Sequence, residues 1–231
     1  MLRIPTLAAL MLAATALTAC DDDDSPTALE GFARVRVVQA SPNAPNLDVL
    51  VDGEPELTSI AFRSVSQYLE VEPGSANVRV RATGATTNVI DFNTTLDDDA
   101  DYTVIVAGLL ANIEALVLSD DNSAPPAGSV RVRFVHAAPS AGNVDIYVTA
   151  PGVSIATLPP SLSNVAFKVS SPYTGVPTGT YQVRVTATGS KTPIIDTGPV
   201  TLTAGQVRTG IALDGPGGGA PFGALILEDR S

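Results

Sequence analysis

The stretch RVRVVQASPNAPNLDVLV (residues 34–51) decides the fold, because it returns later in the chain as RVRFVHAAPSAGNVDIYV (residues 131–148). The two windows start 97 positions apart and share 10 of their 18 residues. The similarity resumes after an insertion of 8 residues in the second copy, and it extends to ALVLSDD (115–121) and ALILEDR (224–230). The chain therefore contains two copies of one unit, each of a size that is common for a single domain.

Within each copy, apolar and polar residues alternate in short runs. Val35 and Val37 alternate with two arginines, as expected for a β-strand whose aliphatic face is dry and whose arginines lie on the other face. Turn-forming pairs such as Asp52-Gly53 separate the runs. About seven short strands per copy predict an all-β fold, with two tandem antiparallel β-sandwiches of immunoglobulin-like architecture.

Composition divides the chain into five segments. We assign residues 1–19 to a signal peptide, 20–31 to an acidic tether, 32–119 to the first sandwich, 120–128 to a linker and 129–231 to the second sandwich. The linker, DDNSAPPAG, has the prolines, acids and glycine of a loop.

The sandwiches must be stabilised by apolar burial, because a single cysteine cannot form an internal disulfide. Aromatic residues are few, and two matched pairs are expected to supply the large core side chains. These pairs are Phe62 with Tyr68 and Phe167 with Tyr173.

The N-terminal segment ends at the only cysteine. Arg3 is followed by an apolar run that is too short to span a bilayer and is typical of a signal peptide. Leu17-Thr18-Ala19-Cys20 resembles the lipobox of bacterial lipoproteins, in which the cysteine receives a diacylglyceryl group and the peptide before it is removed. We therefore expect Cys20 to anchor an exported protein to an inner or outer envelope membrane. The alternatives are an ordinary cleaved signal with an incidental cysteine, or an uncleaved helix.

The overall composition excludes several classes of function. A net charge of −11 repels phosphate backbones, so nucleic acid is not an expected partner. One cysteine and one histidine cannot supply the ligands of structural zinc, and no cofactor is expected.

Three segments together resemble the domain of unknown function 4397: ARVRVVQASPNAPNLDVLVDG (33–53), IAFRSVSQYLEVEPG (60–74) and YTVIVAG (102–108). Both copies carry the pattern. The resemblance implies exported bacterial or archaeal proteins, often lipoproteins, with tandem β-sandwiches, and it implies no activity. The copies depart from the family pattern in places: Gln39 replaces a histidine that the second copy keeps as His136, and Gly142 replaces a proline.

His136 is the only histidine and the first candidate for catalysis. A hydrolase would need a nucleophile and an orienting acid beside it, and Ser140 and Asp145 are the nearest candidates in the sequence. The alternative is that Gln39 and His136 form hydrogen bonds at the end of the first strand of each copy. The sequence favours this structural role, because no nucleophile-elbow motif accompanies the histidine.

Two further segments are candidate ligand sites. Asp97, Asp99 and Asp101 have the spacing that opens a calcium loop, but the closing acid is missing, so a solvated turn is favoured over a weak calcium site. The segment GPGGGAPFG (215–223) lacks the lysine of a phosphate-binding loop and is more typical of a flexible hairpin tip.

Asp48 and Asp145 occupy matching strands, and the preceding strands carry Arg36 and Arg133. A ligand site is one interpretation of these four residues. Cross-strand ion pairs are the preferred interpretation.

These observations predict a lipid-anchored envelope protein without enzymatic activity, whose sandwiches present loops or edge strands to a protein or polysaccharide partner. The alternative is an envelope hydrolase or metal-assisted enzyme that uses the second copy around His136. A structural spacer without a ligand is a third possibility.

Overall fold

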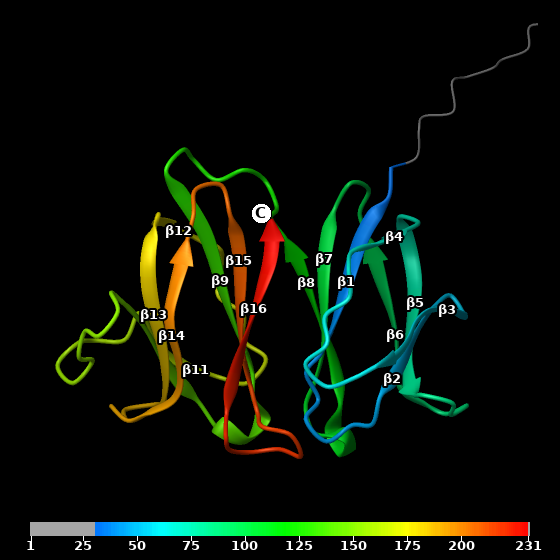
Figure 1. Ribbon diagram of the computed structural model, residues 1–231. Helices are drawn as coiled ribbons and strands as arrows, with labels where there is room; N and C mark the ends of the chain where they lie inside the picture. The colour runs from blue at the N-terminus through cyan, green and yellow to red at the C-terminus, as the bar shows by residue number, and fades with distance from the viewer. Residues whose placement is uncertain (1–30, 231) are drawn as a thin grey trace, which may run out of the picture. The chain divides into compact units, whose positions relative to one another are not determined.

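The alternating runs of the sequence form strands in the computed structural model, which describes residues 31–230. The first copy contains eight strands in two four-stranded sheets (Figure 1). One sheet has the order β4-β1-β7-β8, with β1 (Ala33–Gln39), β4 (Leu69–Val71), β7 (Asp101–Ala107) and β8 (Glu114–Asp120). The other has the order β3-β2-β5-β6, with β2 (Leu47–Val51), β3 (Glu54–Ile60), β5 (Gly74–Ala82) and β6 (Asn88–Leu96).

The second copy repeats this arrangement strand by strand. Its first sheet has the order β12-β9-β15-β16, with β9 (Ser129–Ala137), β12 (Thr174–Pro177), β15 (Val207–Leu213) and β16 (Gly223–Arg230). Its second sheet has the order β11-β10-β13-β14, with β10 (Val144–Thr149), β11 (Leu162–Val165), β13 (Gly179–Ala187) and β14 (Pro193–Leu202).

The all-β class and the two successive pairs of sheets confirm the fold prediction. The details differ in two respects. Each copy has eight strands where about seven were expected. The sheets are also not purely antiparallel, because β1 pairs with β7, and β9 with β15, in parallel.

Strand alternation determines which side chains fill each sandwich. The buried core of the first copy comprises Val37, Leu47, Val49, Val78, Val80, Ile90, Val104, Val106 and Ile113. The buried core of the second copy is smaller and comprises Val144, Ile146, Val185, Ile195 and Ala212. Strands that correspond in sequence and pairing therefore enclose two differently filled interiors.

The arginine face of the first strand is buried in its middle, contrary to the prediction that only the aliphatic face is dry, although Arg34 on the same face is exposed. Arg36 and Arg133 are each 3% exposed. The reason is that β1, β7 and β8 pack against β9, β15 and β16, and we call this contact the junction. Its apolar side chains come from both copies: Val38, Ala40, Ile105, Ala107, Val135, Ala137, Ile211, Leu213 and Leu227. Both copies accordingly belong to one compact unit, Gly31–Ser231.

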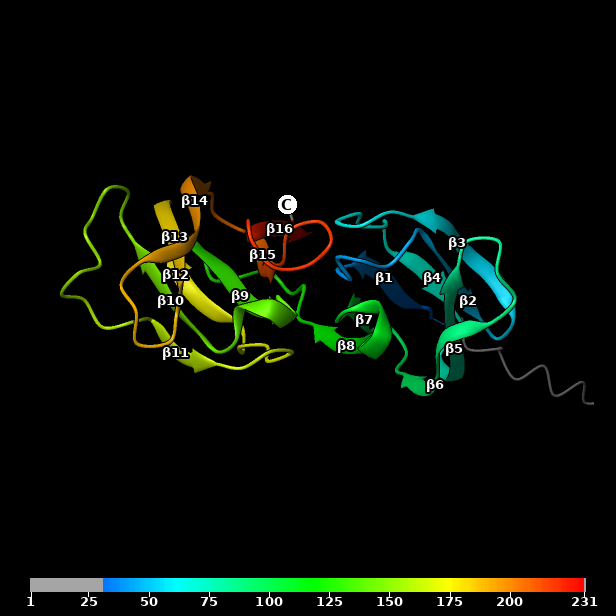
Figure 2. The ribbon, with the colours of Figure 1, turned by 90° about the horizontal axis from the view of Figure 1, so that it is seen from below.

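The connections are mostly short turns. The insertion in the second copy forms the loop 150–161 between β10 and β11, which projects from that sandwich (Figure 2). Two short 3-10 turns, η1 (Leu110–Asn112) and η2 (Pro139–Ala141), are the only helical elements among residues 31–230. None of the helical segments in this range has the length and hydropathy needed to cross a membrane.

Several predictions from the sequence concern residues outside the described range. The predicted signal peptide (1–19), the predicted lipidation site Cys20 and all of the predicted tether except Gly31 lie there. Asp120 was assigned to the linker, but it is the last residue of β8 and is buried, because its carboxylate takes part in the junction.

Candidate functional site

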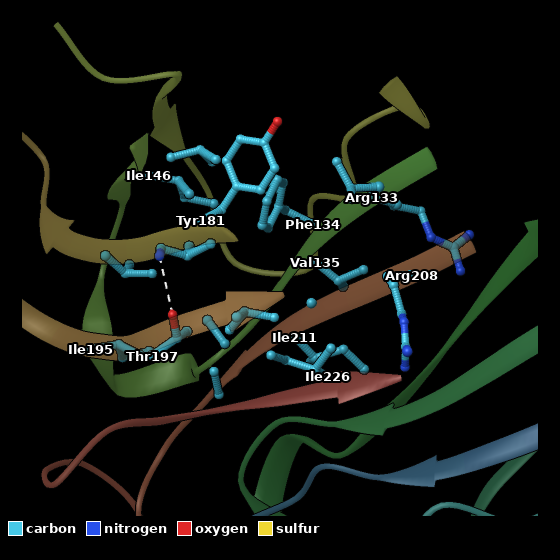
Figure 3. A pocket seen from close by; sticks show the side chains of 18 of the residues that line it. Arg133, Phe134, Val135, Ile146, Tyr181, Ile195, Thr197, Arg208, Ile211 and Ile226 are labelled. Atoms are coloured by element: carbon cyan, nitrogen blue, oxygen red, sulfur yellow. Dashed lines mark hydrogen bonds between the residues drawn. The ribbon is translucent and has the colours of Figure 1, made fainter. Parts of the chain in front are cut away.

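The second sandwich contains an apolar slot between its two sheets (Figure 3). The inner part of the slot has a volume of about 70 Å³. Side chains from both sheets line it, among them Phe134 of β9, Ile146 of β10 and Ile195 of β14. Apart from Arg133, Thr197, Arg208 and the hydroxyl of Tyr181, the lining side chains carry only hydrocarbon.

The slot exists because β15 carries smaller interior residues than β7, its counterpart in the first copy. Val37 pairs with Val104 in the first copy, whereas Phe134 pairs with Gly210 in the second. Two positions further on, the buried Val106 is replaced by Ala212. Two valine side chains of the first core therefore have almost no counterpart in the second.

The ring of Phe134 compensates for only part of this loss. A Cβ atom on Gly210 would lie 3.3 Å from Cδ1 of Phe134, so the ring covers the glycine and leaves little room for a side chain there. The ring lines the slot without filling it (Figure 3).

At the end of the slot, too, the second copy lacks large apolar side chains that the first copy has. Tyr102 of β7 is 7% exposed and closes the end of the first core. Its counterpart in β15 is Arg208, whose guanidinium group points away from the slot and meets Glu228 at 3.0 Å (Figure 3). On β14, Thr197 stands where the first copy has Phe92, and its hydroxyl accepts a hydrogen bond from the backbone of Val183 at 3.1 Å.

A wider recess adjoins the inner part of the slot. It has a volume of about 340 Å³ and lies between the edge strands β11 and β12. The recess and the inner part share the lining residues Val132, Phe134, Val148, Val176 and Tyr181. The recess also carries the hydroxyl groups of Ser161, Ser171 and Thr174. Together the two spaces reach the size of small-ligand sites, which is roughly 300 to 1,000 Å³.

Strands β9 and β15 line the slot with one face and form the junction with the other. The junction contains a reciprocal pair of buried salt bridges. Arg36 of the first copy donates to the carboxylate of Asp229 in the second. Arg133 of the second copy donates to the carboxylate of Asp120 in the first at 2.5 Å. All four side chains are at most 4% exposed.

Hydroxyl groups complete this network in the same reciprocal way. Thr103 and Thr209 each donate to the aspartate of their own copy at 2.5 Å, and each accepts a hydrogen bond from an arginine Nε. The hydroxyl of Tyr68 donates to Asp120 at 2.7 Å, and that of Tyr173 donates to Asp229 at 2.9 Å. The buried carboxylates thus receive several charged or polar donors, as buried charges require.

The tyrosine rings cover the arginines. The Arg36 guanidinium lies 4.8 Å from the ring centre of Tyr68, and that of Arg133 lies 4.5 Å from the ring centre of Tyr173. The expectation that these tyrosines fill the sandwich cores is therefore wrong, and Phe167 likewise packs against the junction cluster. The tyrosines lie at the junction because their hydroxyl groups find polar partners in Asp120 and Asp229 there.

The network raises the pKa of its members Arg36 and Tyr68. Burial alone would lower the pKa of Arg36, but the carboxylate of Asp229, followed by Tyr68 and Asp120, raises that pKa above its ordinary value. Burial, aided by the charge of Asp120, raises the pKa of Tyr68. Arginine and tyrosine therefore keep their protons throughout the neutral range.

His136 is fully buried at the end of β9. Its Nε2–H donates to the carbonyl oxygen of Gly142 at 2.7 Å, and its Nδ1 accepts from the backbone N–H of Ala138 at 3.3 Å. Burial lowers the pKa of His136, against smaller opposing effects of the Gly142 carbonyl and Asp214. Gln39 makes the corresponding contact in the first copy, where its Oε1 accepts from the backbone of Ser41 at 2.6 Å.

The structure does not assemble the hydrolase constellation around His136. Both ring nitrogens face backbone groups, so the imidazole is not directed at Ser140. The carboxylate of Asp145 is occupied elsewhere, because it accepts from the backbone of Asn164 at 2.8 Å and of Gly189 at 2.9 Å.

Asp48 has the same role in the first copy as Asp145 has in the second. It accepts from the backbone of Ser59 at 2.9 Å and from the hydroxyl of Thr83 at 2.8 Å. These hydrogen bonds, that of Ser59 first, lower the pKa of Asp48. Each aspartate thus binds an edge strand, at Ser59 of β3 or Asn164 of β11, and also the turn that follows β5 or β13. Ser59 and Asn164 both have positive φ.

The predicted ion pairs of Asp48 with Arg36 and of Asp145 with Arg133 are wrong. Arg36 and Arg133 bind the junction aspartates instead. The cause is topological, because β1 and β2 belong to different sheets of the sandwich, as do β9 and β10.

Asp97, Asp99 and Asp101 do not converge on a calcium site. Both oxygens of Asp101 accept hydrogen bonds from Arg34, at 2.6 and 2.7 Å, and Asn122 donates to one of them. Asp99 lies in a turn at a positive φ of 55°. No group of three or more His, Cys, Asp or Glu side chains within residues 31–230 is arranged to hold a metal ion.

The glycine-rich segment forms the loop between β15 and β16, as a hairpin tip would. It is hydrogen-bonded at both ends and to the first copy. The backbone N–H of Gly217 donates to the carbonyl of Pro42 at 2.8 Å, and that of Gly219 donates to the Asp214 carboxylate at 2.9 Å.

Two features escaped the reasoning from sequence, and both left a signal in the repeat. Asp120 and Asp229 occupy the same, next-to-last position of the matched segments ALVLSDD and ALILEDR, but Asp120 was assigned to the linker and Asp229 was given no role. The slot is visible when YTVIVAG (102–108) is compared with RTGIALD (208–214), since three interior residues become Arg, Gly and Ala.

Comparison with known proteins gives a family match and remote structural similarities. Residues 33–147 match the family described as Domain of unknown function (DUF4397), so the chain contains a DUF4397 domain that spans the first sandwich and extends into β10. No curated protein matches the chain.

Three solved structures are similar at TM-scores of 0.25 to 0.28, and similarity this remote carries no information on function. One, described as "Alpha-glucan binding by a streptococcal virulence factor", is 12% identical over 78% of this chain and 92% of that chain, with a TM-score of 0.27. Another is the family CBM26 module of Amy13K from Eubacterium rectale in complex with maltoheptaose, 6% identical over 86% of this chain and 98% of that chain, with a TM-score of 0.28. The third concerns family 41 carbohydrate-binding modules from streptococcal virulence factors, 12% identical over 78% and 93% of the two chains, with a TM-score of 0.25.

Proposed function

We propose that this chain is a lipid-anchored cell-envelope protein that acts by binding rather than by catalysis, and that the slot of the second sandwich is its binding site. One observation carries the proposal: two copies with matched strands differ in that the first core buries nine apolar side chains, whereas the second buries five and borders an apolar slot. A cavity lowers stability roughly in proportion to its volume. A hollow that the second copy keeps at the positions where the first copy has Val104 and Val106 is therefore best explained by use.

The first sandwich and the junction act as the support for this site. The slot is lined by β9 and β15. In the junction, Arg133 of β9 pairs with Asp120, and Thr209 of β15 donates to Asp229, the partner of Arg36. A binding site on strands that are fixed from behind keeps its shape without the ligand, which favours affinity.

The anchor rests on the motif at Cys20. An acylated cysteine would hold the protein at an envelope membrane, inner or outer, through two or three chains. Residues 20–31 then form an acidic tether of about 40 Å at most when fully extended. A protein or polysaccharide partner stays a prediction for the outer loops and edge strands.

The hydrolase or metal-assisted alternative has less support. Its candidate residues make structural contacts, since His136 binds backbone groups at the end of β9 and Asp145 accepts from the backbone of β11 and of the turn after β13. A group that is already satisfied by backbone partners is poorly placed to move a proton of a substrate.

Native mass spectrometry tests the proposal. The Cys20→Ser chain, which cannot take the lipid and needs no detergent, is incubated with an organic extract of bacterial envelopes. We expect one additional mass of a small molecule on this chain, retained after Val106→Ala in the first core and lost after Ala212→Val in the second. Absence of any bound molecule, or equal binding by the Ala212→Val variant, would contradict the proposal.

A further inference from the structure

The inner part of the slot selects against polar ligands. Its walls consist mainly of valine, isoleucine, leucine and aromatic side chains. The hydroxyl of Thr197 is already bonded to the backbone of Val183. A ligand with hydroxyl or charged groups at this depth would lose its hydration without gaining partners, which is costly.

The dimensions of the inner part select against rings. A dry cavity of about 150 Å³ accommodates benzene. The inner part of the slot has less than half of that volume, at about 70 Å³. The end of an extended hydrocarbon chain needs a smaller cross-section than a ring, and its remaining methylene groups can continue into the recess of about 340 Å³.

The charged groups at the border of the slot are already paired. Arg133 donates to Asp120, and Arg208 meets Glu228 at 3.0 Å. Each guanidinium charge is thus neutralised by a carboxylate, and the Nε of Arg208 is the buried donor of these two groups that has no hydrogen-bond partner among residues 31–230. The border of the slot therefore offers no excess positive charge to a carboxylate or phosphate headgroup. The polar groups that remain near the opening are hydroxyls, with Ser161 in the recess and Thr174 exposed at its rim.

We infer that the slot of the second sandwich binds a single unbranched aliphatic chain, with the methyl end between β14 and β15 and the polar end at the hydroxyl groups between β11 and β12. This inference rests on the proposed function, because it names the ligand class of the same site. An uncharged aliphatic alcohol is the simplest molecule with this chemistry, and it serves as the probe.

The test compares a linear and a cyclic alcohol with the same number of carbon atoms. The Cys20→Ser chain, labelled with ¹³C at isoleucine methyl groups, is titrated with 1-hexanol, 1-octanol and cyclohexanol. The reporters are the four isoleucines that line the slot, Ile146, Ile195, Ile211 and Ile226. We expect 1-hexanol to bind at least tenfold more tightly than cyclohexanol. Two further methylenes should improve the affinity roughly fifteenfold, because each buried methylene contributes about a factor of four.

Matched variants locate the binding. Ala212→Val introduces the residue that the first copy has at this position and should weaken 1-octanol binding at least tenfold. Thr197→Phe, which introduces the counterpart Phe92, serves the same purpose if the first variant does not fold. Val106→Ala enlarges the first core instead and should leave the affinity of the second sandwich unchanged.

The possible outcomes distinguish a failure of the aliphatic-chain inference from a failure of the proposed binding site. If cyclohexanol shifts the four methyl groups with an affinity equal to that of 1-hexanol, the slot is a binding site but the chain inference is wrong. If no alcohol shifts them, while each reaches the protein at millimolar concentration, both the inference and the proposed binding site fail. Loss of binding after Val106→Ala but not after Ala212→Val would also overturn the assignment.

Discussion

Replacing Asp229 by asparagine removes the negative charge that Arg36 of the other copy meets inside the junction. The side chains of this pair are 4% and 0% exposed, so water cannot replace the lost partner. The next carboxylate, that of Asp120, lies 3.8 Å from Arg36 and already binds Arg133. Removal of one partner from a buried pair costs about 3 to 5 kcal/mol, which is a large part of the stability of an ordinary domain.

Urea unfolding, followed by circular dichroism, measures this cost on the Cys20→Ser chain. We expect Asp229→Asn to lower the midpoint by at least about 1 M, since the free energy falls by about 1 to 3 kcal/mol per molar urea. The double variant Arg36→Met/Asp229→Asn should be more stable than the sum of the single effects predicts, because it leaves no unpaired charge. Asp91→Asn is the matched control, because Asp91 pairs with Arg79 at the surface, with side chains 52% and 41% exposed.

Two results would refute this reasoning. If Asp91→Asn lowers the midpoint as much as Asp229→Asn, burial does not set the strength of the pair. If the effects of Arg36→Met and Asp229→Asn are additive, the two residues are not coupled, and the junction is held by its apolar side chains alone.

Three further predictions concern the cores, the histidine and the anchor. Ala212→Val adds two buried carbon atoms to the hollow and should raise the free energy of unfolding by about 1.5 kcal/mol, whereas Val106→Ala should lower it by at least that amount. Denaturant titration measures both changes. A loss of stability in the Ala212→Val variant would contradict the hollow core. Burial lowers the pKa of His136, so near pH 6.5 this histidine takes up a proton in the unfolded chain but not in the folded chain. The free energy of unfolding therefore falls as the pH falls below that value, by at most about 1.4 kcal/mol per pH unit. His136→Gln should remove this dependence in unfolding measured between pH 7 and pH 5, and an unchanged pH profile would show that the histidine is not its source. Cys20→Ser should abolish incorporation of radioactive palmitate and release the protein from the membrane fraction, and label that persists in the variant would exclude lipidation at this cysteine.

The repeat and the alternation were sufficient to predict the fold class. Val35 and Val37 are placed correctly inside the first sandwich, because a period of two residues assigns side chains to opposite faces of a strand. The same pattern could not predict the environment of Arg36, since alternation shows which residues share a face but not what packs against it. Only the second copy, at a sequence separation of 193 residues, supplies the partner Asp229.

The sequence did not predict the partners of Asp48 and Asp145, although it contained the information needed to find the slot. Asp48 and Asp145 were expected to pair with Arg36 and Arg133, but the chain crosses from one sheet to the other between the two strands, and composition does not show that crossing. The slot could have been found from the sequence. The replacement of Val104 by Gly210 indicates a missing core side chain only when the interior positions of the two copies are compared one by one. The alternation pattern alone does not call for that comparison.

Diffraction from crystals of the Cys20→Ser chain under xenon pressure tests the difference between the two cores directly. Xenon occupies dry apolar cavities and scatters strongly enough to be located. The account predicts a xenon atom in the second sandwich, among Phe134, Ile146 and Ile195, and none between the sheets of the first sandwich. Xenon in the first core, or a second core that excludes it, would contradict the account.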